Sequence, residues 1–426
     1  MEITGRTTKT QSLKFGILCL NLFIIGLSIP KIYFFFVILL PATLSFFGYL
    51  RIPKYIFKYP INLISTMSLV LFMILNYYQV YVYNLLDDTM KIIGTIIMTI
   101  TLFLVGISLD LKKMPFFPYN ILAVNISIFS GGIIWVFLSV GLYNRWSFSV
   151  IDILVSQRKV ASIWRLDESV NGPSLDIFSY LGLSLVGVLI CGLKYYLPFL
   201  KRSFRGSILL LTILIFVCMS LYSSISLGAR TPIIVLLLSV IATLIFTLSK
   251  DLELSGNIGY GYIYIVFYFF IGFIFYLLLS SDYIDTLTSM GIGSRLQSQG
   301  LETPRYEAWQ QAISQMWDFP WGGRSLKLDI EFVHNIWLDQ MYDAGILPML
   351  LLLTFHIAQI PVIIRFLKLK LPIIIHVFVL CTIFAFLAAF MQAPVIQANP
   401  LFFAISCFSF GTWARLTCDF KYTKSG

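Results

Sequence analysis

A chain of 426 residues in which 58% are hydrophobic and only 12% are charged carries more apolar surface than a water-soluble core can bury. This composition excludes an ordinary soluble enzyme and indicates an integral membrane protein. Apolar runs recur at about 17 to 25 residues, the length at which a helix crosses the hydrocarbon layer, whereas a membrane β-barrel would show runs of about 10 alternating residues.

The pattern predicts an all-α fold, a polytopic membrane protein with about twelve transmembrane helices in one domain over residues 1–426. The first apolar run is as long as a span and has no small-residue cleavage site, so we interpret it as a retained helix. The predicted spans cover residues 13–29, 32–50, 61–80, 91–109, 119–142, 174–193, 206–226, 231–249, 258–280, 342–360, 371–391 and 400–416.

Basic residues predict the orientation of these spans. With both termini cytoplasmic, most of the 30 Lys and Arg residues fall in short cytoplasmic loops, as the positive-inside rule requires. The net charge of +10 is therefore largely explained by topology, and we expect no nucleic-acid partner.

The two longest predicted loops, residues 143–173 and 281–341, are external and should contain short helices. Most of the basic residues left outside are arginines, whose planar, permanently charged fork suits phosphate oxygens. The external face is thus predicted to bind an anionic, phosphorylated ligand. These arginines are Arg145, Arg158, Arg165, Arg230, Arg295, Arg305 and Arg324.

The second loop contains the stretch TPRYEAWQQAISQM, residues 303–316. A capping Thr303 and the proline after it predict a helix start, and aromatic residues recur at helical spacing. We expect an amphipathic helix at the membrane surface, closed by a Pro-Trp-Gly-Gly turn, with Arg305 in its first turn. Its aromatic residues could equally serve only as interfacial anchors.

The stretch EFVHNIWLDQMYDAG, residues 331–345, contains one of only three histidines. Glu331, Asn335 and Asp339 are spaced to share one helical face, and His334 lies one turn from Glu331. A neutral imidazole can accept a proton from a hydroxyl, and a nearby carboxylate can stabilise the cation that forms. The alternative is an interfacial histidine without chemistry, an interpretation that fits the other two histidines better.

Arg230 stands directly before Thr231 and Pro232, where a span is predicted to begin. Unpaired N–H groups at a helix N-terminus add to its positive charge, so the position suits a phosphate. Snorkelling of Arg230 to lipid headgroups is the alternative.

The sequence contains no phosphate-binding loop and no HExxH or GxSxG motif in a suitable context. An external site also has no ATP supply, so the energy of any reaction must come with the substrate, most simply as a diphosphate ester. We therefore expect neither a cofactor nor a metal.

Three motifs together resemble the O-antigen polymerase and ligase superfamily. They are an Arg-x3-Trp pattern at Arg305 and Trp309, a Gly-Gly turn at residues 322–323, and His-Asn followed by nine residues and a glycine at residues 334–345. The SLGARTP stretch around Arg230 is similar to a further motif of that superfamily. Because GILPMLLL follows instead of the ligases' Gly-Thr-Thr cluster, the chain resembles the Wzy-type polymerases more than the ligases.

The resemblance implies a glycosyltransferase on the periplasmic face of the bacterial inner membrane, joining repeat units linked to undecaprenyl diphosphate. It implies that Arg230 and Arg305 hold the diphosphate and that His334 is the general base. It also implies a chain-length co-polymerase as partner. The residues expected to assist in binding substrate are Arg295, Arg324, Glu331, Asn335, Arg158 and Arg165.

Three alternatives remain at this stage. A ligase would transfer finished polysaccharide to the lipid A core with nearly the same chemistry. A flippase or exporter would use the arginines to bind headgroups, but it should carry ionisable residues deep within its spans, and the sequence has almost none there. A structural scaffold would need neither His334 nor so many external arginines.

Overall fold

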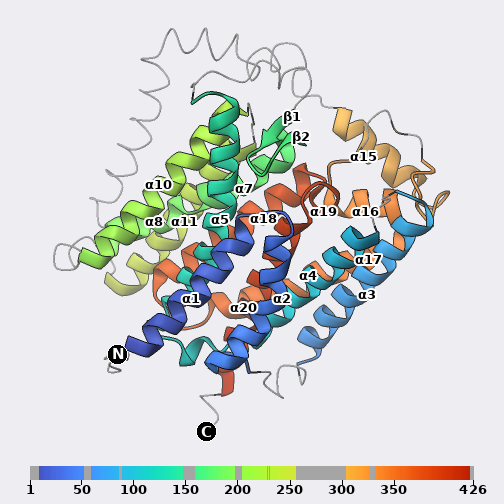
Figure 1. Cartoon of the computed structure of the whole chain (residues 1–426). Helices are drawn as coiled ribbons and strands as arrows, with labels where there is room; N and C mark the ends of the chain where they lie inside the picture. The colour runs from blue at the N-terminus through green and yellow to red at the C-terminus, as the bar shows by residue number, and fades with distance from the viewer. Residues whose placement is uncertain are drawn as a thin grey trace. The chain divides into compact units, whose positions relative to one another are not determined.

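The computed structural model describes residues 9–51, 59–85, 89–146, 159–196, 204–227, 229, 231–255, 304–326, 328 and 332–422. Within these ranges, nine helical segments are long and apolar enough to cross a membrane, and each coincides with a predicted span (Figure 1). They are α3 (Pro60–Val82), α4 (Thr89–Ser108), α5 (Asn120–Tyr143), the segment Leu175–Tyr195, α10 (Phe204–Ser226), α11 (Thr231–Ser255), α17 (Ile346–Leu367), α18 (Ile373–Gln392) and α20 (Pro400–Tyr422).

The first two predicted spans are also helices, α1 (Lys9–Gly26) and the shorter α2 (Ile32–Phe47). The segment Leu175–Tyr195 is built from α7 (Gly172–Ser184), α8 (Val186–Cys191) and the π-helical η3 (Gly192–Tyr196). The span predicted at 258–280 lies outside the described residues. The prediction of a helical fold with helices able to span a membrane is therefore confirmed, with a helix at eleven of the predicted spans, whereas the count of twelve stays a prediction.

The chain divides into two compact units. Unit 1 comprises residues 1–135, 304–372 and 389–426, and unit 2 comprises residues 136–303 and 373–388. The candidate motifs after residue 304 all fall in unit 1.

Helix α20 forms the centre of unit 1, where 94% of its spanning window is buried. It packs most closely on α4, where Gly106 and Gly411 face each other. A Cβ added to Gly411 would lie 2.6 Å from the carbonyl oxygen of Phe103, so only glycine allows this approach. Close contact through small residues is the usual way in which membrane helices pack, since hydrocarbon provides no hydrophobic drive between them.

The helices around α20 expose apolar side chains on their outer faces, as lipid contact requires. Only 44% of the spanning window is buried in each of α3 and α17, which pack against each other. Three short helices complete unit 1 near the ends of these spans: α15 (Pro304–Gln315), α16 (Ile336–Ala344) and α19 (Val395–Ala398). The 3-10 turn η2 (Leu111–Lys113) follows α4.

Unit 2 is built around α7, which packs on α10 and α11. Asp176 of α7 is buried, and its Oδ1 accepts a hydrogen bond of 3.2 Å from Ser224 Oγ of α10. A carboxyl group in an apolar segment needs such a donor, since an unsatisfied one is costly there.

The described part of the first long loop contains a β-hairpin where short helices were predicted. Strand β1 (Lys159–Ser162) pairs antiparallel with β2 (Arg165–Asn171), with Val160 opposite Val170 and a shift of register after Ala161. The expectation of a short helix is therefore wrong for residues 159–171, where Arg165 begins a strand instead. Each strand carries one β-branched residue, Val160 and Val170, and these lie directly opposite each other, which favours an extended backbone.

Candidate functional site

Helix α15 begins at Pro304, as the sequence predicts, and places Arg305 in its first turn. Trp309 lies one turn further, and its indole Nε1 donates a hydrogen bond of 2.7 Å to the carbonyl oxygen of Val333. Trp309 also packs against a small apolar cluster that includes Ala312 and Val333, both fully buried. The Arg-x3-Trp motif is thereby fixed to the segment that carries His334.

The backbone around His334 is not helical. His334 has a φ of 59°, and Asn335 is extended, with φ −146° and ψ 121°. Helix α16 begins only at Ile336, and Asn335 is its N-cap: its Oδ1 accepts hydrogen bonds of 3.2 Å from the N–H groups of Trp337 and Leu338. The prediction of one shared helical face is therefore wrong for Asn335 and Asp339, because the capping asparagine precedes the first helical residue, and Glu331 lies outside the described residues.

Asp339 holds this turn in place. Its Oδ1 accepts hydrogen bonds from the N–H groups of Val333 at 2.7 Å and His334 at 3.2 Å, and its Oδ2 accepts one from Asn335 at 3.1 Å. Burial raises the pKa of Asp339 well above its ordinary value, the nearby Asp343 carboxylate raises it further, and the three N–H groups oppose both effects. The sequence suggested Asp339 only as a neighbour of His334, and the structure makes it the residue that shapes the turn.

Both motifs meet the last turn of α18. The Nη1 atom of Arg305 donates a hydrogen bond of 2.6 Å to Oε1 of Gln392. The Nδ2 atom of Asn335 contacts Sδ of the adjacent Met391 at 3.6 Å. Arg305 and the His334–Asn335 pair, about 30 residues apart in the sequence, thus lie at the same end of one helix within unit 1.

The two glycine motifs also meet. Gly323 N–H donates to the carbonyl oxygen of Asp343 at 2.9 Å, and Ile346 N–H donates to the carbonyl oxygen of Pro320 at the same distance. Gly345 has a φ of 97°, and an added Cβ would lie 2.5 Å from the Pro320 oxygen. The Pro-Trp-Gly-Gly turn and the glycine that ends the His-Asn motif are therefore one structural feature, which fixes the start of α17.

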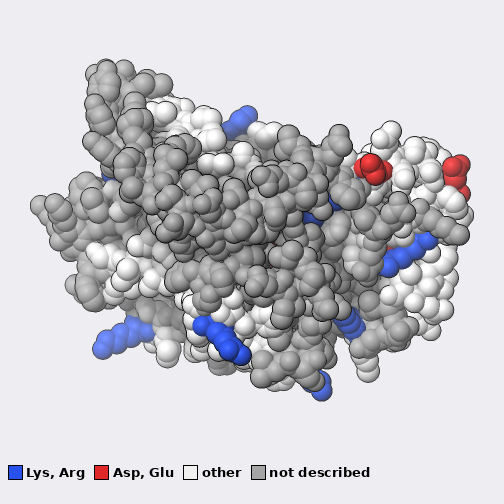
Figure 2. Space-filling view, turned by 90° about the horizontal axis from the view of Figure 1, so that it is seen from above, with Lys and Arg blue, Asp and Glu red and all other residues white. Residues whose placement is uncertain are grey.

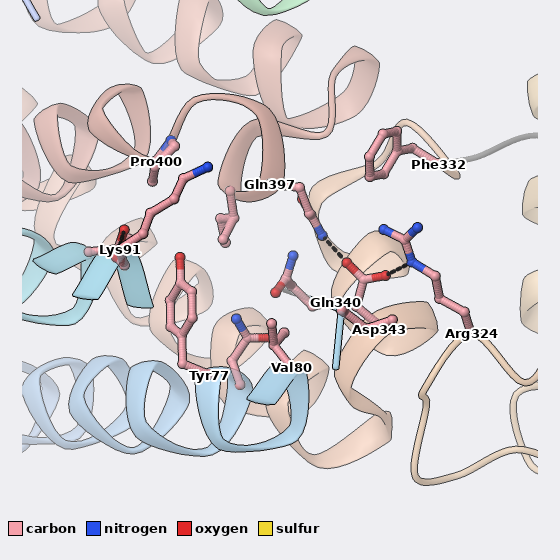
Figure 3. A pocket seen from close by; sticks show the side chains of 13 residues that line it. Tyr77, Val80, Lys91, Arg324, Phe332, Gln340, Asp343, Gln397 and Pro400 are labelled. Carbon is pink, nitrogen blue, oxygen red and sulfur yellow. Dashed lines mark hydrogen bonds and ion pairs between the residues drawn. The ribbon is translucent and has the colours of Figure 1, made fainter. Parts of the chain in front are cut away.

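Arg324 follows this turn and makes an ion pair (Figure 3). Its Nε lies 2.8 Å from Oδ1 of Asp343, whose Oδ2 accepts a hydrogen bond of 2.8 Å from Gln397 Nε2. The guanidinium carbon also lies 5.1 Å from the ring centre of Phe332. The side chain of Arg324 is 29% exposed and that of Asp343 only 4%, so this arginine neutralises a buried carboxylate.

Of the remaining predicted residues, one belongs to the other compact unit and four lie outside the described residues. Arg165 is the first residue of β2, in unit 2. Arg230, Arg295, Glu331 and Arg158 lie outside the described residues.

A second histidine lies beneath the His-Asn motif, and the motif analysis did not predict it. Trp337 Nε1 donates a hydrogen bond of 3.1 Å to Nδ1 of His356, whose ring lies 5.0 Å from that of Phe390. His356 was expected near the end of its span, but α17 continues to Leu367, so this histidine stands at the middle of the helix. His356 is 22 residues from His334 in the sequence, so no local pattern indicated that the two segments are in contact.

Viewed from above, the described part of this face shows separate basic and acidic side chains and no continuous basic patch (Figure 2). Over the described ranges, no group of three or more His, Cys, Asp or Glu side chains is arranged to hold a metal ion. Comparison of the sequence with protein-family models finds no match, and comparison with curated proteins also finds none.

Proposed function

We propose that this chain is a membrane glycosyltransferase that polymerises lipid-linked saccharide repeat units, in the manner of the Wzy-type O-antigen polymerases that its motifs resemble. The observation that supports this most is the joint approach of Arg305 and Asn335 to residues Met391 and Gln392. It gives a cation and the histidine-bearing turn a common location beside the end of a membrane span, where a lipid diphosphate would lie.

In the proposed reaction, His334 takes the proton from a hydroxyl of the acceptor saccharide. The acceptor oxygen then forms a bond to C1 of the donor sugar, while the bond between C1 and the diphosphate oxygen breaks. Undecaprenyl diphosphate leaves with the electron pair, and Arg305 and Arg230 stabilise its negative charge. A fixed guanidinium suits this role because it is charged at every relevant pH and can bind two oxygens at once.

The donor would be the growing polymer on undecaprenyl diphosphate, and the acceptor one repeat unit on the same lipid. Arg295, Arg158 and Arg165 are proposed to help bind these anionic substrates. The enzyme would work at the periplasmic face of the inner membrane, with both termini cytoplasmic, beside a chain-length co-polymerase.

The test is complementation of a strain that lacks this gene. Arg305→Ala, His334→Ala and Arg230→Ala are introduced separately, equal membrane levels are verified, and lipopolysaccharide is separated on a gel. Wild type should restore a ladder, and each variant should leave the core capped with a single repeat unit, since loss of one charge-stabilising donor lowers such rates about 10²- to 10³-fold.

Arg365→Ala is the matched control, because Arg365 is exposed in the last turn of α17, at the opposite end from α16. It should restore a full ladder. Bare core in the three variants would favour a ligase or a flippase, and a full ladder in the His334 and Arg305 variants would refute the proposed site.

A further inference from the structure

A cavity of about 200 Å³ lies in unit 1 between α3, the first turns of α4, α16 and α19 (Figure 3). Gln340 of α16 projects toward its middle, between Tyr77 and Gln397. The Arg324–Asp343 ion pair forms part of one side, and Lys91 stands across the cavity from it. Of the residues proposed for catalysis that the structure describes, Arg305 and His334, neither lines this cavity.

Three amide atoms of the lining are buried without a hydrogen bond from any described residue: Nε2 of Gln340, Oδ1 of Asn76 and Oε1 of Gln397. The Gln340 and Asn76 side chains belong to residues that are each only 1% exposed. Most buried polar groups in proteins find a partner, so three unsatisfied ones around one cavity indicate a ligand.

Elsewhere in the same unit, the side-chain amide of another buried glutamine is hydrogen-bonded. Gln359 of α17 is 2% exposed, and its Nε2 donates to Ser65 Oγ at 2.6 Å and to the Phe355 carbonyl oxygen at 3.2 Å. Asn21 and Asn120 of unit 1 also have a buried amide oxygen without a described partner, so the cavity is distinguished by three such atoms lining one space.

The hydrogen-bonding pattern selects the chemistry of the ligand. Asp343 is a carboxylate paired with Arg324 and can only accept, so Gln397 must present its Nε2 to Asp343 and its Oε1 to the cavity. That oxygen needs a donor, which an ionised phosphate does not offer. A hydroxyl group both donates and accepts, and so could satisfy Gln397 and Gln340 together.

The size of the cavity and its position near His334 further restrict the class of ligand that it could bind. About 200 Å³ is below the ~300–1,000 Å³ of sites for drug-sized molecules, so the cavity fits a single ring better than an oligomer. Gln340 lies four residues after Ile336, hence about 6 Å along the helix from the first residue after the His334–Asn335 turn. A ring held there would be a near neighbour of a saccharide reacting at His334.

We propose that this cavity is a glycan subsite that holds one hydroxyl-rich sugar ring of the substrate. The identity of the glycan rests on the proposed function, whereas the presence of a hydroxyl-binding site rests on the three amides alone. Gln340 is its central binding residue, and Asp343 acts by orienting Gln397.

The test measures binding by the purified full-length chain in detergent. The probes are the repeat-unit oligosaccharide released by mild acid from the source strain's own lipid-linked intermediate, the intact lipid-linked unit, and inorganic pyrophosphate. Wild type is compared with Gln340→Met and Gln340→Leu, with Gln359→Met as the matched control, and binding and the thermal unfolding midpoint are recorded for each.

We expect both saccharide probes to bind wild type and to bind the Gln340 variants at least tenfold more weakly, with little change in unfolding midpoint. Gln359→Met should unfold at a lower temperature and bind normally, because it loses satisfied hydrogen bonds outside the cavity. His334→Ala should also bind normally while losing polymer synthesis, which separates failure of the subsite from failure of the proposed reaction.

Four results would overturn the proposal. The first is equal saccharide binding by wild type and both Gln340 variants, and the second is binding of pyrophosphate alone that Gln340 substitution weakens. The third is the absence of any saccharide binding to wild type, and the fourth is a large loss of stability in both Gln340 variants. The third result would mean that the cavity holds only water.

Discussion

Trp309 and Val333 are joined by a hydrogen bond of 2.7 Å from the indole N–H to the backbone carbonyl oxygen. This hydrogen bond and the packing of Trp309 against the apolar cluster around Val333 join the helix that carries Arg305 to the turn that carries His334. The separation of the two proposed catalytic side chains therefore depends on a residue that has no role of its own in the proposed reaction.

The first prediction concerns this contact. Trp309→Phe keeps an aromatic ring but removes the donor, and a net hydrogen bond contributes ~1 kcal/mol, so polymer synthesis should fall roughly five- to tenfold at equal membrane levels. Trp317→Phe is the control, since Trp317 is 73% exposed. Chain growth is measured from the ladder on gels, and equal activity of the two variants would show that the contact does not position Arg305.

The second prediction concerns the meeting of the two glycine motifs. Gly345→Ala places a side chain at φ 97° and against the Pro320 carbonyl oxygen, so it should destabilise the chain by ~2 kcal/mol or more. Gly16→Ala is the matched control, because Gly16 lies in α1 with open space at its Cβ and should unfold at the same temperature as wild type or higher.

The unfolding midpoint of the purified protein measures both glycine variants. A Gly345→Ala protein as stable as wild type would contradict the tight packing of the turn against the start of α17. A loss of activity without loss of stability would instead indicate that the glycine serves the reaction directly.

The sequence predicted the helical architecture well, because a membrane span is recognised from its length and composition alone. The same reasoning gave α15 from Pro304 and the turn at Gly322 and Gly323. It failed where the local backbone conformation differs from the spacing pattern. The spacing predicted a helix through Asn335, but His334 has a positive φ and Asn335 is an extended N-cap.

The contacts that assemble the candidate site lay beyond sequence reasoning. Gln392 and Gln397 lie in apolar sequence and belong to no recognised motif. Each meets its partner only where its helix packs against another one. Asp343 sits at the boundary of a predicted span, so its pairing with Arg324 became visible only in three dimensions.

The third prediction is a pH dependence that depends on Asp339. Because the pKa of its carboxyl is raised well above the ordinary value of 3.8 in the folded chain, its contribution to stability is fully present below that value and is lost as pH rises through the folded pKa. Asp339→Asn removes the titration and keeps an oxygen for the Val333 and His334 N–H groups.

The difference in unfolding midpoint between wild type and Asp339→Asn should therefore shift in favour of the variant as pH rises above about 4. Comparison of the two proteins at each pH cancels the titration of carboxyl groups that they share. A difference that stays constant, or that shifts in favour of wild type, would mean that the three N–H groups outweigh burial at this carboxyl.

The fourth prediction separates a structural from a substrate-binding role for Arg324. Arg324→Met leaves the buried Asp343 without its cation and should destabilise the chain by ~2 kcal/mol, less than the ~3–5 kcal/mol of a fully buried pair because the arginine is partly exposed. Adding Asp343→Asn removes the stranded charge and should restore most of the unfolding midpoint. If the double variant also regains polymer synthesis, Arg324 is structural; if it regains stability alone, Arg324 binds the substrate as the motif analysis predicted. A single variant as stable as wild type would show that the ion pair contributes nothing.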